Sequence, residues 1–232
     1  MFVCKLENRR PIRSFVRREG RMTDAQRRAL DELWPGYGVD LGGGELDLTA
    51  VFGRLAPVIM EIGFGNGESL VQMALARPDN NFLGVEVHRP GVGRMLGRIK
   101  ELNLNNLKVV CVDAAEVLKS HIAKDVLDGV HIFFPDPWPK KRHHKRRLLQ
   151  TQFIRSVERA LKPGGRLHIA TDWQDYADHI VEVMASIEGF ENIAGKGVYS
   201  PRPEYRPLTK YEARGERLGH VVHDLIFEKR GT

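Results

Sequence analysis

Acidic side chains stand at the ends of several short apolar runs in this chain. Glu61, Glu86, Asp113 and Asp136 each lie at or just after such a run, and Asp136 is flanked by two prolines. In open α/β sheets ligands bind outside the carboxyl ends of the strands, so side chains at these positions can surround one bound molecule. One acid after a strand is typical of a helix cap, but the recurrence favours a binding site whose carboxylates accept hydrogen bonds from hydroxyl and amino groups.

A glycine-rich turn follows the first of these runs. The segment "EIGFGNGES" places Gly63, Gly65 and Gly67 at alternate positions, where the backbone can turn sharply and approach a ligand at a helix N-terminus. The dinucleotide fingerprint Gly-x-Gly-x-x-Gly fails in both frames, because its third glycine falls on Glu68 or Leu70. Glu68 would also repel a pyrophosphate, whereas a cofactor with a sulfonium and an amino group tolerates nearby acids. This spacing disfavours a nicotinamide oxidoreductase.

Short apolar runs alternate with amphipathic segments, which predicts an α/β fold whose parallel sheet is covered by helices on both faces. A separate helix is expected from Asp24 to Leu33, with Thr23 as its N-cap and Trp34-Pro35-Gly36 as its stop. The segment 161–165 is expected to form a tight turn, and the proline-rich segment 200–207 no regular structure. The expected strands are 57–62, 81–87, 107–112, 129–134, 166–171, 190–194 and 219–228, and the helices are about 67–77, 90–103, 114–123, 146–162 and 174–187.

Positive charge is concentrated in two segments. Residues 1–28 carry a local charge of +6 and residues 139–157 one of +7, which leaves −7 for the rest of a chain whose total is +6. Two basic patches on an acidic body are typical of a protein that binds a polyanion. We interpret residues 1–50 as a partly flexible basic extension and 51–232 as the main domain, with Gly42-Gly43-Gly44 as a loop between them.

Several classes of protein are disfavoured by composition. The N-terminus is polar and basic where a secretory signal has an apolar core, and no apolar run approaches the length of a membrane span. Cys4 and Cys111 provide neither a disulfide framework nor metal-ligand spacing. We therefore expect a cytoplasmic protein with no metal and no membrane partner, as a monomer or a homodimer.

The order of glycine turn, acid after the second strand and Asp after the third resembles class I S-adenosylmethionine-dependent methyltransferases. More closely, the chain resembles the bacterial tRNA (guanine-N7-)-methyltransferases, the TrmB family, from about Ile12 to Glu228. The likeness rests on the segments "IRSFVRREGRMT" (12–23), "MEIGFGNGES" (60–69), "GVEVH" (84–88), "FFPDPWPKKRHHKRR" (133–147), "ATDW" (170–173) and "TKYEARG" (209–215).

The resemblance implies a Rossmann-like, seven-stranded, mostly parallel sheet whose last strand is antiparallel. It also implies transfer of a methyl group from S-adenosylmethionine to N7 of a guanosine in the variable loop of tRNA. Asp136 would be catalytic. The cofactor site would be formed by Glu61, Gly63, Gly65, Gly67, Glu86, Asp113 and Asp136. The tRNA would contact Lys140, Lys141, Arg142, His143, His144, Lys145, Arg146, Arg147 and Asp172, the guanine pocket would include Thr209, Lys210, Tyr211 and Glu212, and the N-terminal arm would add Arg13, Arg17, Arg18 and Arg21.

The implied chemistry needs positioning more than proton transfer. Guanine N7 carries a bare lone pair, so no general base is required, and in-line orientation of the reactants becomes the main task. Asp136 could orient the reactants and favour the positive charge that develops on the purine. Glu212 could accept from guanine N1 and N2 and so exclude adenine. Two alternatives remain open: a methyltransferase acting on another guanine atom of RNA, such as the N2 amino group, and a non-catalytic RNA-binding protein.

Overall fold

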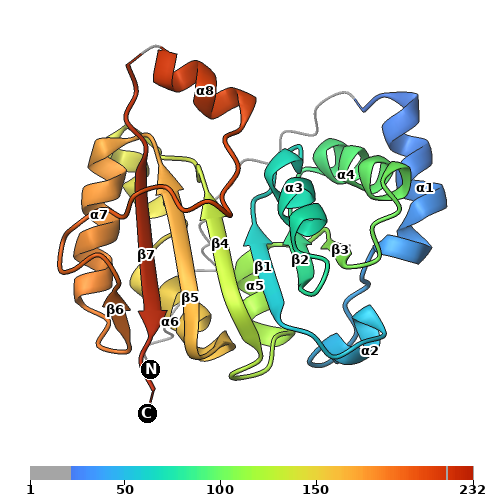
Figure 1. The fold of residues 1–232 in the computed structure, drawn as a ribbon, viewed down its shortest axis with the longest axis horizontal. Helices are drawn as coiled ribbons and strands as arrows, with labels where there is room; N and C mark the ends of the chain where they lie inside the picture. Colours follow the sequence, from blue (N-terminus) through green and yellow to red (C-terminus); the bar gives the residue numbers. More distant parts are fainter. Residues whose placement is uncertain (1–21, 218, 232) are drawn as a thin grey trace, which may run out of the picture.

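A seven-stranded β-sheet forms the centre of the computed structural model, which describes residues 22–217 and 219–231 (Figure 1). The strand order is β3-β2-β1-β4-β5-β7-β6; the first five strands run parallel, and β7 is antiparallel to both β5 and β6. The predicted sheet with an antiparallel last strand is therefore confirmed. The strands are β1 (Val58–Ile62), β2 (Asn81–Val85), β3 (Leu107–Val110), β4 (Leu127–Phe133), β5 (Leu161–Thr171), β6 (Phe190–Asn192) and β7 (His223–Lys229).

Helices cover both faces of this sheet and define two hydrophobic cores (Figure 1). Successive side chains of a strand point to opposite faces, so β1 contributes Met60 to one core and Ile59 to the other. Burial on both faces explains why the parallel strands read as continuous apolar runs. The helices are α1 (Asp24–Tyr37), α2 (Leu48–Phe52), α3 (Glu68–Ala76), α4 (Arg89–Glu101), α5 (Ala114–Ser120), α6 (Thr151–Ala160), α7 (Gln174–Ala185) and α8 (Lys210–Arg217), with a 3-10 helix η1 at Lys141–Arg146. Among the described residues, no helix is long and apolar enough to cross a membrane.

Helix α1 begins where the sequence predicts and ends later. Thr23 and Gln26 form a reciprocal capping box, in which each side chain accepts the backbone N–H of the other residue. The predicted stop at Trp34 is wrong, because the helix runs through Pro35 to Tyr37 and the N–H of Gly38 closes its last turn on Trp34. The helix packs closely on α4, where a Cβ at Gly93 would lie 2.6 Å from the backbone oxygen of Gln26.

Two boundaries around β5 also differ from expectation. The predicted turn at 161–165 belongs to β5, which begins at Leu161 directly after α6 and bends at Gly164 with φ of +76°. Helix α6 begins at Thr151 instead of about 146, because Arg147 and Gln150 are extended and separate it from η1.

On one face of the sheet, the covering layer includes an irregular segment, which lies before the last strand, and not only helices. Residues 200–209, here called the C-terminal strap, cross in front of β4, β5 and β7 (Figure 1). They contain no helix or strand beyond a single bridge from Ser200 to Asp224, as predicted for 200–207. The strap leads into α8 above the carboxyl ends of the parallel strands (Figure 1). The sequence predicts no helix at 210–217 and a last strand from 219, whereas the structure has α8 there and β7 begins at His223.

Candidate active site

A cleft opens at the carboxyl ends of β1 to β4. Its lining includes Gly63, Glu86, Asp113 and Asp136, which come from four loops that are distant in sequence. The structure thus brings together four of the residues expected around a cofactor. Ile62, Val85, Val87, Val112, Ala114, Ile132, Phe133, Phe134, Pro135 and Leu148 complete the wall.

The glycine turn is fixed by backbone conformations that favour glycine. Gly63, Gly65 and Gly67 all have positive φ, at 75°, 57° and 76°. A Cβ at Gly67 would lie 2.2 Å from the end of the Met95 side chain, whereas open space surrounds the position of a Cβ at Gly63 and Gly65. The turn can therefore accept a ligand close to its backbone.

Glu86 links this turn to the end of β2. Its Oε2 accepts the N–H of Gly65 over 2.9 Å, and its Oε1 accepts the N–H groups of Val87 and His88 over 2.6 and 2.9 Å. Asp113 is held similarly, because one of its oxygens caps α5 by accepting the N–H of Ala115 over 3.0 Å. Both carboxylates are oriented by backbone groups while they line the cleft, so capping α5 does not remove Asp113 from the cleft wall.

Glu61 lies behind the cleft, not in its wall. Its side chain is buried, one carboxylate oxygen has no hydrogen-bond partner among the described residues, and burial raises its pKa to about 8. His131 stands beside it in register on β4, with an unpartnered Nδ1 and a pKa that burial lowers well below its ordinary value. An orphaned buried carboxyl next to an acid-lined cleft fits a cofactor that carries a cationic amino group.

The turn that carries Asp136 is bracketed by two unusual backbone conformations. Phe134 has φ of +51° and Trp138 has φ of +46°, a region that bulky residues rarely adopt and that costs about 1–3 kcal/mol each. The N–H of Phe134 donates to Ala170 of β5 over 2.8 Å and anchors the turn to the sheet. Asp136 is exposed at the mouth of the cleft.

The basic segment after Asp136 folds back onto Trp138. The guanidinium of Arg146 lies 5.0 Å from the Trp138 ring centroid, and the His143 ring packs edge-on at 5.8 Å. Burial and the neighbouring Arg142 and Arg146 lower the pKa of His143. The cations that the segment exposes are Lys140, Lys141, Arg142 and Lys145.

Arg147 does not face solvent as predicted for an RNA contact. It is 2% exposed; its Nε donates to the carbonyl of Pro137 over 3.0 Å, and its Nη2 donates to the Asp175 carboxylate. Its guanidinium also lies 4.9 Å from the Tyr176 ring centroid. Arg147 therefore attaches the Asp136 turn to α7, and the prediction of an RNA contact is wrong for this residue.

Of the expected guanine pocket, the structure describes the side chains of Thr209 and Glu212. Thr209 accepts the N–H of Glu212 over 3.2 Å and caps α8, while both oxygens of the buried Glu212 carboxylate are bound by Arg206. Glu212 thus does not present free oxygens to the solvent. Asp172, at the carboxyl end of β5, lies 3.6 Å from His220. The side chains of Lys210 and Tyr211, and the arm residues Arg13, Arg17, Arg18 and Arg21, lie outside the described part of the chain.

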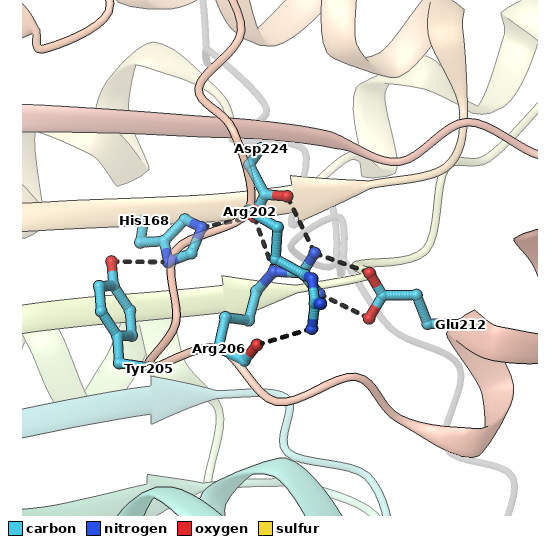
Figure 2. Close-up of polar contacts among 6 residues, drawn as sticks. All are labelled: His168, Arg202, Tyr205, Arg206, Glu212 and Asp224. Carbon is cyan, nitrogen blue, oxygen red and sulfur yellow. Dashed lines mark hydrogen bonds and ion pairs between the residues drawn. The ribbon is translucent and has the colours of Figure 1, made fainter.

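Arg206 is the main residue of this site that sequence reasoning missed. It joins Glu212 of α8 to Asp224 of β7, and Asp224 in turn contacts His168 of β5 (Figure 2). Tyr205 completes the cluster through a 2.9 Å contact between its hydroxyl and Nδ1 of His168. No sequence motif signals these contacts, because they depend on the strap crossing the sheet.

This strand order, with an acid-lined cleft at the carboxyl ends of β1 to β4, defines a class I methyltransferase. Solved structures of the same fold include the 16S rRNA methyltransferase KamB (TM-score 0.59, 16% identity, 81% of this chain and 95% of that one). Another is a mutant of the 16S rRNA (adenine(1408)-N(1))-methyltransferase from Catenulisporales acidiphilia, solved with its cosubstrate SAM (TM-score 0.57, 17% identity, 83% and 93%). A family model described as "Putative methyltransferase" matches residues 55–225.

Sequence relatives identify the family within this class. The tRNA (guanine-N(7)-)-methyltransferase of Aeromonas hydrophila is 55% identical over 95% of this chain and 93% of its own length. That of Alkalilimnicola ehrlichii is 56% identical over 96% and 94%. The chain belongs to the tRNA (guanine-N(7)-)-methyltransferase family, whose methyl donor is S-adenosylmethionine.

Proposed function

We propose that this protein methylates N7 of a guanosine in the variable loop of tRNA and that Asp136 is its catalytic residue. The observation that carries the proposal is the place of Asp136, which lies at the mouth of the acid-lined cleft and directly before the exposed cations of 140–145. Family membership supports the reaction; the variable loop and the roles of individual residues are our inference.

The cleft residues fit the methyl donor of the family. When bound, S-adenosylmethionine supplies an electrophilic methyl group on a sulfonium centre. Glu86 and Asp113 are oriented by backbone N–H groups and would accept hydrogen bonds from hydroxyl and amino groups of the cofactor. Glu61 lies behind the cleft wall, and its buried carboxyl would lose its proton on cofactor binding and then stabilise the cationic amino group.

Asp136 acts by position and charge instead of by proton transfer. Guanine N7 has no proton to lose, so a carboxylate is not needed as a base. Its negative charge favours the positive charge that develops on the purine as N7 is alkylated, and the hydrogen-bonded turn around it removes the cost of reorganisation. Glu212 would accept from the N1–H and N2–H donors of guanine, which adenine does not present together, once Arg206 releases the two carboxylate oxygens that it binds in the free protein.

The tRNA backbone is bound by the exposed cations beside this site. Lys140, Lys141, Arg142 and Lys145 are exposed on the segment that directly follows the Asp136 turn. Contacts of such side chains with phosphates supply much of the affinity for nucleic acid and make it fall with salt. The carboxylate of Asp136 then faces the base while the cations hold the backbone.

The experiment that tests the proposal uses a labelled methyl donor and unmodified tRNA, followed by nuclease mapping and digestion to nucleosides. We expect 7-methylguanosine in the variable loop. Another methylated nucleoside, such as N2-methylguanosine, or the same product outside the variable loop would contradict the proposed specificity. Absence of transfer by a protein that still binds tRNA would favour a non-catalytic RNA-binding role.

A further inference from the structure

The C-terminal strap carries a charged side chain into the interior. Arg206 is 1% exposed and donates four hydrogen bonds to two buried carboxylates (Figure 2). Its Nε and Nη2 bind the two oxygens of Asp224 over 2.7 and 2.9 Å. Its Nη1 and Nη2 bind the two oxygens of Glu212 over 2.7 Å each. Arg206 is therefore shared between a strand of the sheet and the helix that carries the expected guanine-recognition residue.

The two carboxylates are not equivalent. Asp224 has a second partner, because its Oδ1 lies 2.7 Å from Nε2 of His168. Burial and Arg206 lower the pKa of His168, although Asp224 opposes the shift, and a neutral ring protonated on Nε2 satisfies both neighbours. This ring donates to Asp224 and accepts from the Tyr205 hydroxyl on Nδ1. The cluster then contains one cation, Arg206, and two anions, Glu212 and Asp224. Arg206 therefore remains neutralised by Asp224 when its hydrogen bonds with Glu212 are broken.

Arg206 presents to Glu212 the same pattern of hydrogen-bond donors that guanine presents. The guanidinium offers two parallel N–H groups to the two oxygens of one carboxylate. Guanine offers the same pair, N1–H and N2–H, from the guanidine unit within its ring. A carboxylate bound by Arg206 in this way already has the bidentate geometry that guanine requires.

Arg206 also touches the turn that carries Asp136. Its guanidinium carbon lies 5.8 Å from the ring centroid of Phe134 and 5.9 Å from that of Phe133. Both rings line the cleft, and Phe134 precedes Asp136 by two residues. The guanidinium therefore stands between the expected recognition carboxylate and the expected catalytic turn.

We propose that Arg206 is a positioning residue for guanine recognition: it holds Glu212 in bidentate geometry and yields it to N1–H and N2–H of the target base, while Asp224 keeps Arg206 paired. The inference rests on the proposed function, in which Glu212 contacts guanine. Because one donor pair replaces the other, Glu212 always has a partner. A buried carboxylate without a partner would be strongly destabilising. Adenine lacks this donor pair and cannot displace Arg206 from Glu212.

The test compares tRNA carrying guanosine at the target position with the same tRNA carrying inosine, which lacks the N2 amino group. The ratio of the two kcat/KM values is measured for the wild-type protein, Arg206→Lys and Arg202→Lys. Lysine retains the charge opposite Asp224 but presents no planar pair of donors. Arg202 serves as the matched control because it lies on the same strap and contacts only the backbone oxygen of Arg206 in Figure 2, over 3.3 Å.

We expect the wild-type protein and Arg202→Lys to prefer guanosine about tenfold or more, the effect of one hydrogen bond to a charged group. In Arg206→Lys the ratio should fall close to one, mainly through loss of guanosine transfer. Both rates come from the same preparation, so loss of folded protein cancels from the ratio. Arg206→Gln, which ends in a single amide nitrogen, provides a second variant and should lower the ratio as well.

An unchanged ratio in Arg206→Lys or Arg206→Gln, with both substrates slowed equally, would overturn the inference and leave Arg206 a structural residue. A wild-type ratio near one would overturn it too, while methyl transfer itself continued. Absence of wild-type transfer to the guanosine tRNA would instead be a failure of the proposed function.

Discussion

The backbone N–H of Gly65 donates a 2.9 Å hydrogen bond to the carboxylate of Glu86, which ties the glycine turn after β1 to the end of β2. We expect Glu86→Ala to weaken binding of S-adenosylmethionine about tenfold or more, because a charge-assisted contact to the ligand and the anchor of the turn are lost together. Calorimetric titration measures this effect. Glu116→Ala, at an exposed position of α5, is the control and should bind normally; equal affinities for the two variants would exclude Glu86 from the cofactor site.

Asp136 should affect transfer and not tRNA affinity. We expect Asp136→Ala to lower kcat by about a hundredfold or more, the scale seen when one preorganised electrostatic group is removed from a transition state. Single-turnover methylation and a filter-binding assay measure the two quantities separately. Asp79→Ala, in an exposed loop before β2, should leave both unchanged. Near-normal turnover of Asp136→Ala would refute the catalytic role.

The exposed cations of the basic segment should determine the salt dependence of tRNA binding. In the triple variant Lys141→Ala, Arg142→Ala, Lys145→Ala, we expect the slope of log affinity against log salt concentration to shrink by about 2, since each lost phosphate contact removes roughly 0.7–0.9. Arg147→Met is the contrasting variant. Its side chain is buried against Pro137 and Asp175, so it should lower the melting temperature without changing the slope. An unchanged slope in the triple variant would place the RNA-binding surface elsewhere.

Glu61 should make the ligand-free protein less stable as the pH rises. Its folded-state pKa of about 8 lies above that of the unfolded chain, so only the folded state keeps the proton between the ordinary Glu range and pH 8. The free energy of unfolding should therefore decrease through that window, by at most about 1.4 kcal/mol per pH unit, and level off above it.

Urea titrations at pH 6, 7 and 8 give the free energy of unfolding of Glu61→Gln and of the wild-type protein. The difference between the two values isolates the contribution of Glu61, because all other titrating groups are the same in both proteins. The variant should gain stability relative to the wild type as the pH rises. Glu45→Gln, at an exposed position, should show no such gain. A constant difference between Glu61→Gln and the wild type would mean that Glu61 is not protonated in the folded protein.

The parts of the site that follow strands could be predicted from the sequence, and the parts that depend on crossing segments could not. Glu86 and Asp113 follow apolar runs, and the rule for ligand sites in parallel sheets places them at one edge. Arg147 looks in the sequence like one more cation of a basic run, but contacts with Pro137 and with Asp175 and Tyr176 of a helix about 28 residues later bury it. The Arg206 cluster needs the path of the strap over β5 and β7, which no local periodicity encodes.

Because the strap is attached to the last strand, some of its contacts can form only late in synthesis of the chain. Ser200 pairs with the backbone of Asp224, and the Asp224 side chain holds Arg206, so these two contacts of the strap form only after β7 has been made. A nascent chain that has just finished α8 therefore has Glu212 but still lacks Asp224, the second carboxylate that binds Arg206. The proposed positioning of Glu212 for guanine would thus be complete only with the final strand of the chain, and a shortened product lacking 223–229 would lose it together with an interior strand of its sheet.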